Sequence, residues 1–333
     1  MRVLLTGGMG FIGSHIAIVL NELGYDLVII DNLSNSNIST LKNLNKLMSK
    51  KINFFKVDLL DKKNLGKIFQ KFTFDAVIHL ASFKSVSKSV ETPLKYYENN
   101  LVGTLNLINE MLLNKVNTIV FSSSATVYGN AKISPIKEDA VTKPINPYGE
   151  IKLNIEKFLE YICISNKNFT CISLRYFNPV GAHSSGFIGE NPLDIPNNLM
   201  PIIINVALKK QKILKIFGNN YETKDGTGVR DFIHVMDVAE GHSNALNYVQ
   251  NKKGYFTFNL GTGKGVSVLE LKNAFESFCS IKIPYEFKSR RLGDVPIMYA
   301  DVNKAKKELN WEAKRNLEEI CLSGWKHKLI LNK

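Results

Sequence analysis

The residues with the clearest capacity for chemistry are Tyr148 and Lys152, which lie four positions apart in the segment PYGEIK. This spacing places both side chains on one face of a helix, one turn apart. An ammonium group beside a phenol favours the phenolate and lowers the pKa of the tyrosine. Such a tyrosine can take a proton from a sugar or alcohol hydroxyl near neutral pH. In a lysine-rich chain the same spacing also arises by chance on solvated helices, so further motifs must decide.

A glycine-rich turn near the N-terminus supports the chemical interpretation. An apolar strand at 2–6 is followed by Gly7, Gly10 and Gly13, and then by a helical pattern up to about residue 23. A strand, a glycine turn and a helix in this order are the dinucleotide-binding fingerprint in its expected setting. Gly7 permits the tight turn, Gly10 lets the backbone approach a pyrophosphate, and Gly13 lets the helix pack closely. The free N–H groups of the helix then face the phosphates.

The next strand, at 26–30, ends in Asp31, which lies 18 residues beyond Gly13. A carboxylate at this position accepts the adenosine ribose hydroxyls and repels a 2′-phosphate. No arginine occurs at 32–36. The pattern therefore favours NAD over NADP, with an aspartate that only stabilises a turn as the alternative.

Strands and helices continue to alternate through the first half of the chain. Strands are predicted at 53–57, 76–81 and 118–122, with helices near 61–72 and 93–114. This alternation predicts an α/β fold of the Rossmann type, with a doubly wound parallel sheet. Asp58 follows one strand and could bind the adenine amino group or cap the next helix. His79 lies within an apolar strand, which favours a core histidine over a catalyst.

Three serines, at 122–124, stand at the end of the strand that begins at Thr118. Open α/β sheets bind ligands at the carboxyl ends of their strands. Ser124 precedes Tyr148 by 24 residues, and the segment KPINP at 143–147 ends regular structure just before the tyrosine helix. Serine clusters commonly only cap and turn the chain, but here the strand end, the tyrosine and the lysine agree.

A further strand at 170–174 completes the regular pattern, after which the alternation weakens. We expect a Rossmann domain at 1–177 and a smaller C-terminal substrate-binding domain at 178–333, with some later segments returning to the first domain. Polar groups in the second half, including Asn197, Asn198, Arg230 and Arg291, suit an anionic ligand. Their spacing alone fits surface ion pairs equally well.

Composition limits the function classes further. No apolar run reaches the roughly 18 residues needed to span a bilayer. The N-terminal segment opens a folded motif and is not expected to be a signal peptide, which favours the cytoplasm. The net charge of +13 comes from dispersed lysines without an arginine-rich stripe, so nucleic acid is not expected as a partner. The four cysteines have no metal-ligand spacing, so no metal is expected.

Taken together, these motifs resemble the extended short-chain dehydrogenase/reductases. The resemblance is closer still to the UDP-glucose 4-epimerases, also called UDP-galactose 4-epimerases. Matching stretches run through almost the whole chain. They include FSSSATVYG at 121–129, LRYFNPVGAH at 174–183, DGTGVRD at 225–231 and NLGTG at 259–263.

The resemblance implies that UDP-galactose and UDP-glucose are interconverted with NAD as cofactor. Tyr148 would take the proton of the sugar 4-hydroxyl while NAD takes the hydride from carbon 4 and returns it to the other face of a 4-keto sugar. Lys152 would hold the nicotinamide ribose, and Ser124 would bind the reacting oxygen. Family members are commonly homodimers, paired through helices that correspond to 93–114 and 148–165.

The same resemblance implies two sets of ligand-binding residues. The cofactor set is Gly7, Gly10, Phe11, Ile12, Gly13, Asp31, Asn32, Asn35, Ser36, Asp58, Leu59, Leu80, Ala81, Lys84, Asn99, Ser122, Tyr148, Lys152 and Tyr176. The substrate set is Ser124, Phe177, Asn178, Asn198, Leu199, Lys215, Ile216, Phe217, Arg230, Arg291, Asp294 and Met298.

Three alternatives stay open to different degrees. A nucleotide-sugar 4,6-dehydratase would need an acidic pair after the serine, where this chain has Ala125 and Thr126. A non-catalytic NAD-binding sensor tends to lose the tyrosine or the lysine, and both are present. Met298 stands where family members have a bulky aromatic or a small residue. The alternative of an epimerase acting on UDP-N-acetylglucosamine and UDP-N-acetylgalactosamine therefore stays open.

Overall fold

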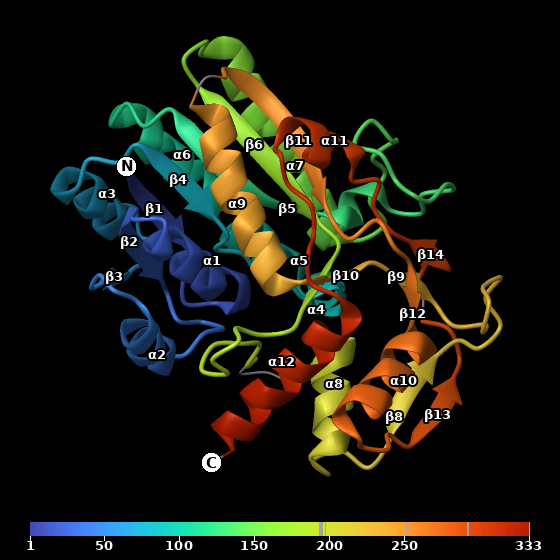
Figure 1. Cartoon of the computed structure of the whole chain (residues 1–333). Coiled ribbons are helices and arrows are strands. Elements are labelled where there is room, and N and C mark those ends of the chain that lie inside the picture. Colours follow the sequence, from blue (N-terminus) through green and yellow to red (C-terminus); the bar gives the residue numbers. More distant parts are fainter. Residues whose placement is uncertain (193–195, 197, 251, 292, 333) are drawn as a thin grey trace.

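A parallel sheet of seven strands forms the centre of the molecule (Figure 1). The computed structural model describes residues 1–333 except 193–195, 197, 251, 292 and 333. The strand order β11-β6-β5-β4-β1-β2-β3 reverses between β4 and β1, which confirms the expected doubly wound α/β class. The strands are β1 (Arg2–Thr6), β2 (Asp26–Asp31), β3 (Asn53–Lys56), β4 (Ala76–His79), β5 (Thr118–Ser124), β6 (Thr170–Tyr176) and β11 (Gly254–Leu260).

Helices cover both faces of this sheet, because alternate residues of its strands are apolar on both sides. In β1, Val3 and Leu5 belong to the hydrophobic cluster shared with α1 and α9, while Leu4 belongs to the cluster shared with α3, α6 and α7. These helices are α1 (Phe11–Glu22), α9 (Val235–Val249), α3 (Lys62–Lys71), α6 (Gly103–Leu113) and α7 (Pro147–Ser165); α2 (Ser39–Leu47) follows β2.

A smaller lobe, built from short strands and three longer helices, lies beyond the carboxyl edge of the sheet (Figure 1). Its hydrophobic cluster includes Ile203, Ile216 and Phe275. The chain also returns to the large sheet, because β11 pairs with β6 and α9 packs on α1. The later elements are β7 (Asn178–Val180), α8 (Leu199–Ala207), β8 (Leu214–Phe217), β9 (Val229–Arg230), β10 (Phe232–His234), β12 (Val266–Ser267), α10 (Val268–Cys279), β13 (Tyr285–Lys288), β14 (Ile297–Met298), α11 (Asn303–Glu308) and α12 (Leu317–Leu331).

Several elements differ from their expected bounds. The strand expected at 118–122 continues to Ser124 and the one expected at 170–174 continues to Tyr176, because the two strands pair in register to their ends. The strand expected at 76–81 ends at His79. The helix expected at 93–114 contains a π-helical turn, η1 (Tyr97–Val102), between α5 (Pro93–Tyr96) and α6. A short helix, α4 (Val86–Glu91), and the 3₁₀ turn η2 (Ala125–Tyr128) were not anticipated.

His79 is a core residue, as the sequence predicted. Its Nδ1 lies 2.7 Å from Thr6 Oγ1 and its Nε2 lies 2.8 Å from Thr104 Oγ1, so both ring nitrogens have partners. Burial lowers the pKa of His79 to about 3, which keeps the ring neutral. His79 therefore ties β1 and β4 to α6 beside the glycine turn. Across the described part of the chain, every helix is too short or too polar to cross a bilayer.

Candidate active site

Tyr148 and Lys152 lie in the first two turns of α7. The helix begins where the sequence supplies both start signals, a proline in its first turn and the Asn146 side chain as cap. Asn146 Oδ1 accepts the Gly149 N–H at 2.9 Å. The beginning of α7 therefore fixes where Tyr148 stands, and Lys152 follows one turn later.

The structure brings both side chains to the end of β5. Lys152 is 2 % exposed, its Nζ donates to the Ser122 carbonyl at 2.7 Å, and it lies 5.7 Å from the centre of the Tyr148 ring. Tyr148 is hydrogen-bonded to Ser124, the last residue of β5. The three predicted catalytic residues thus form one group at the carboxyl edge of the sheet.

The expected pKa of Tyr148 is wrong for the chain alone. Burial raises the pKa of Tyr148 to about 12, and the hydrogen bond to Ser124 offsets only part of this effect. Burial also lowers the pKa of Lys152 to about 7, against the attraction of Glu156. Lys152 therefore carries only part of its charge near neutral pH, which explains why it does not depress the tyrosine as the sequence suggested.

A buried acidic network supports Lys152 from one turn further along α7. Glu156 is 3 % exposed, and its two oxygens accept from Arg175 Nε at 3.0 Å and Nη2 at 2.6 Å. Ser123 Oγ donates to the same carboxylate at 2.5 Å. Sequence analysis missed this residue, although a glutamate four positions after a lysine is a recognisable helix pairing.

The 3₁₀ turn η2 follows Ser124 directly and borders the same group of residues. Thr126 donates to Ser124 Oγ through its backbone N–H at 3.2 Å and its hydroxyl at 3.0 Å. Ala125 is 4 % exposed and carries no ionisable group. The two positions after Ser124 thus orient the serine and add no carboxylate beside it.

The glycine turn has the geometry that a diphosphate requires. Gly7 has a φ of +71°, and a Cβ there would lie 2.7 Å from the Ala81 nitrogen. A Cβ on Gly13 would lie 2.4 Å from the Gly7 carbonyl oxygen, so the close contact of α1 with the turn depends on this glycine. α1 begins with Gly10 as its cap and without a side-chain capping bond. Phe11 and Ile12 follow in its first turn, whose N–H groups suit an anionic ligand.

Asp31 ends β2 beside this turn and is 9 % exposed. Its Oδ2 accepts the Met9 N–H at 3.1 Å, and its Oδ1 accepts the Leu33 N–H at 2.8 Å and the Ser36 hydroxyl at 2.9 Å. These contacts hold the carboxylate and the loop at 32–36, which includes the exposed Asn35, in one arrangement.

Asp58 lies next to this loop and does not cap the following helix. It accepts Asn32 Nδ2 at 2.9 Å and the Leu60 N–H at 2.8 Å, whereas α3 is capped by Asp61. Leu59 is buried against α6, where its carbonyl accepts from Asn106. Asp58 therefore joins the segments after β2 and β3, where the adenosine end of a dinucleotide would lie in this fold.

The loop after β4 brings four more predicted cofactor residues to the edge of the sheet. Leu80 and Ala81 follow the strand directly, and Lys84 lies a few residues further on. Asn99 lies in the π-helical turn, where its amide donates to Asn100 Oδ1 at 2.8 Å. The buried Asn100 side chain bonds both backbone groups of Phe83 and so joins the turn to this loop. π-helical turns often mark functional sites.

The segment after β6 connects the two lobes. The Tyr176 hydroxyl lies 2.5 Å from His242 Nε2, and burial raises the pKa of Tyr176. Phe177 is 7 % exposed and packs in the cluster of η2, together with the partly buried Met298. Asn178 begins β7, and Met298 pairs in register with Arg230.

Four predicted substrate residues come together in the smaller lobe. Arg291 Nε donates to Asp294 Oδ2 at 2.8 Å, and its guanidinium lies 5.1 Å from the centre of the Phe217 ring. Arg230 is within electrostatic range of Asp294 and Arg291, and burial lowers its pKa. Two guanidinium groups thus lie near a single carboxylate, which pairs with only one of them and leaves positive charge for an anionic ligand. Tyr221, under Arg290 at 4.2 Å, joins this group and was missed.

The remaining predicted substrate residues differ in how far their side chains are exposed. Lys215 is exposed, but the Ile216 side chain is 1 % exposed within the core, so only its backbone can face a ligand. Asn198 caps the start of α8, which begins at Leu199. Asn197 lies outside the described residues.

This combination of fold and site defines a class. A doubly wound sheet with a glycine turn and a Ser/Tyr/Lys group at the end of β5 is typical of nucleotide-sugar enzymes related to the short-chain dehydrogenase/reductases. The family model described as GDP-mannose 4,6 dehydratase matches residues 4–323. Within this class, the chain belongs to the UDP-glucose 4-epimerase family.

Several relatives support this assignment over nearly the whole chain. The UDP-glucose 4-epimerase of Dictyostelium discoideum is 51% identical over 98% of this chain and 95% of its own length. The UDP-glucose 4-epimerase of Bacillus subtilis (strain 168) is 50% identical over 98% of this chain and 96% of its own length. The solved UDP-glucose-4-epimerase of Stenotrophomonas maltophila, with NAD and formylated UDP-arabinopyranose, has a TM-score of 0.97 at 41% identity, covering 100% of this chain and 99% of its own.

Proposed function

We propose that this chain is an NAD-dependent epimerase that interconverts UDP-galactose and UDP-glucose at carbon 4. The observation that carries the proposal is the group of Ser124, Tyr148 and Lys152 at the end of β5, beside the glycine turn. The family relatives named above support the same reaction, because they are UDP-glucose 4-epimerases that match nearly the full chain. The glycine turn and Asp31 would hold NAD, which would supply a reversible hydride acceptor at the sugar carbon.

The roles of the chain's own residues follow from their positions. Tyr148 takes the proton of the 4-hydroxyl and later gives it back, and Ser124 holds the oxygen that changes charge. Lys152, whose Nζ donates to the Ser122 carbonyl, would hold the nicotinamide ribose and adds positive charge next to the phenol when it is protonated. Because the chain alone keeps Tyr148 as a phenol, positive charge from the bound cofactor must help to lower its pKa.

The epimerase reaction fits this site better than a dehydratase reaction, although the matching family model carries a dehydratase description. Elimination of the 6-hydroxyl requires a further acid and base beside the sugar. Ala125 and Thr126 occupy the two positions after Ser124, and Thr126 is engaged with the serine. The site therefore lacks a proton donor where the dehydratases have one.

The binding roles divide between the two parts of the chain. We propose that 1–177 holds NAD, with β11 and α9 completing that domain, and that the rest of 178–333 binds the UDP-hexose. The glycine turn, Asp31 and the Asp58–Asn32 contact support the first assignment. Arg230, Arg291 and Asp294 support the second. The four cysteines are free thiols, in keeping with the cytoplasm as the site of this reaction.

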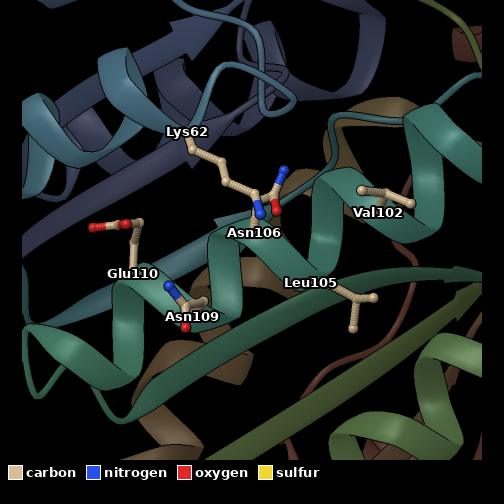
Figure 2. Close-up of a pocket in the computed structure, with 6 residues that line it drawn as sticks. All are labelled: Lys62, Val102, Leu105, Asn106, Asn109 and Glu110. Atoms are coloured by element: carbon tan, nitrogen blue, oxygen red, sulfur yellow. The ribbon is translucent and has the colours of Figure 1, made fainter.

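Pairing of two copies through α6 and α7 is also proposed. These helices cover one face of the sheet, and their outer sides expose large apolar residues that a single chain leaves in water. Figure 2 shows Val102 and Leu105 beside a hollow that Lys62 and Glu110 also line. Strongly exposed apolar side chains on α5, α6 and α7 are Leu94 (71%), Leu113 (69%), Tyr161 (69%) and Ile164 (58%). Such a surface suits a homodimer.

The homodimer is tested by light scattering coupled to gel filtration. Leu105→Glu should shift the protein to a monomer, because it buries a charge in the interface. Leu23→Glu is the matched control, since Leu23 is equally apolar, 57% exposed and lies beyond α1 on the other face. A wild-type monomer contradicts the homodimer.

The reaction is tested with UDP-galactose deuterated at carbon 4. Because the same hydride leaves and returns, UDP-glucose formed in ordinary water should keep the deuterium at carbon 4, and no free NADH should accumulate. Mass spectrometry of the product measures this. Loss of the label to solvent contradicts the hydride mechanism, and absence of UDP-glucose contradicts the proposed function.

A further inference from the structure

A buried carboxylate joins the two proposed binding sites. Glu190 lies between β7 and α8 and is 8 % exposed. Its Oε1 accepts from Lys84 Nζ at 2.8 Å and from Asn198 Nδ2 at 2.7 Å. Lys84 comes from the loop after β4, on the cofactor side, and Asn198 caps α8, on the substrate side. One oxygen therefore connects two residues that are 114 positions apart in sequence.

We infer that Glu190 is a positioning residue that couples the cofactor loop to the binding of the UDP diphosphate. This inference rests on the proposed function, because it takes Asn198 to be a ligand of the substrate. An asparagine amide has two N–H groups, so bonding one of them to Glu190 leaves the second for an anionic oxygen. Glu190 thereby fixes which end of the Asn198 amide faces the substrate.

The charge of Glu190 also has to be balanced. A buried carboxylate near a diphosphate repels it unless a cation neutralises the carboxylate. Lys84 supplies that cation, and its side chain is only half-buried, at 46% exposure. Lys328 is also within electrostatic range of Glu190 but donates its own hydrogen bond to Asn191 Oδ1 at 3.0 Å. Lys84 thus supports diphosphate binding through Glu190.

This arrangement predicts an effect that a merely structural ion pair does not produce. Lys84→Met leaves the Glu190 charge unpaired beside Asn198, and UDP binding should weaken by roughly tenfold. Glu190→Gln removes the charge but keeps an oxygen that can accept from Asn198. In the double variant the two effects should cancel, so its UDP affinity should lie within about twofold of the wild-type value.

The test is calorimetric titration of UDP into each variant in the presence of saturating NAD, with thermal melting to show that each is folded. Lys306→Met and Glu312→Gln, in an exposed ion pair on and beside α11, are the control pair and should not change UDP affinity. A double variant that binds UDP as weakly as Lys84→Met overturns this inference alone. A wild-type protein that binds no UDP overturns the proposed function, and the inference with it.

Discussion

The group proposed to react and the group proposed to bind the nucleotide are built differently. Ser124 ends a seven-residue strand that pairs with β6 along its full length, and Lys152 lies in the 19-residue helix α7 and is 2 % exposed. Arg291 and Phe217, in contrast, belong to the smaller lobe of short strands. The Arg291 side chain is 56% exposed and Phe217 is 37% exposed.

The buried group and the exposed group suit different steps of the proposed reaction. Proton and hydride transfer need donors and acceptors in fixed positions, which a buried sheet edge provides. A charged nucleotide can be bound by an exposed guanidinium group, such as that of Arg291, which is free to reorient when the ligand arrives. Substitutions in the first group should therefore change kcat, whereas substitutions in the second should change KM.

The largest expected effect comes from Tyr148→Phe, which tests the group proposed to react. The change keeps the ring and removes the hydroxyl that transfers the proton, so kcat should fall by roughly 10²–10⁴-fold. UDP affinity should stay unchanged, because we propose that the nucleotide binds in the other lobe. Coupled assays of UDP-glucose formation and UDP titrations measure both quantities.

The matched control for that variant is Tyr248→Phe on α9. The Tyr248 hydroxyl bonds to Glu308 at the surface, far from the end of β5. This variant should keep the wild-type kcat. Full activity in Tyr148→Phe would remove Tyr148 from the reaction.

The burial of the first group also predicts a pH-dependent stability. The pKa of Lys152 falls from 10.5 to about 7 on folding, so the unfolded chain binds more protons between these values and stability rises with pH there. Between pH 7 and pH 9, the unfolding free energy of the ligand-free wild type should rise by about 2 kcal/mol relative to Lys152→Met. Urea unfolding at both pH values measures this. Parallel pH profiles for the two proteins would contradict the buried, partly neutral lysine.

The sequence predicted the residues of the reacting group better than it predicted their surroundings. Gly7, Gly13, Tyr148 and Lys152 were found from spacing because each lies within one strand, turn or helix, where short-range geometry is fixed. The raised pKa of Tyr148 was not predicted, because burial depends on how α7 packs against the rest of the molecule. Local patterns thus predicted the fold class and brought out the residues that we propose to react, but not their electrostatic environment.

Contacts between distant segments account for most of what was missed. Glu190 meets Lys84 across 106 residues, and no spacing rule connects two such positions. The π-helical turn that contains Asn99 interrupts the helix expected at 93–114, and Asn100 in this turn bonds Phe83 in the loop after β4. Glu156 is different, because its position four residues after Lys152 was readable in advance.

Arg291→Met tests the second half of the comparison. Removing one guanidinium from the anionic site should raise the KM for UDP-galactose by about tenfold and leave kcat within about twofold, as expected for lost ground-state binding. Steady-state kinetics measure the two constants. Arg2→Met is the control of equal charge, because Arg2 begins β1 in the large sheet and pairs with Asp26 instead. Equal effects of both changes would indicate a general charge effect and contradict a specific contact.

The smallest expected effect is at Met298, where the two regions meet. Met298 packs in the cluster that contains Phe177 and pairs in register with Arg230, so it borders both the proposed sugar and the proposed nucleotide sites. A flexible, unbranched methionine can leave partial room for an N-acetyl group beside the sugar. We therefore predict that UDP-galactose is the better substrate and that UDP-N-acetylgalactosamine is turned over measurably. Met298→Tyr should reduce the second activity severalfold and spare the first, as separate assays of the two sugars would show, and an equal loss of both would mean that residue 298 does not select the substrate.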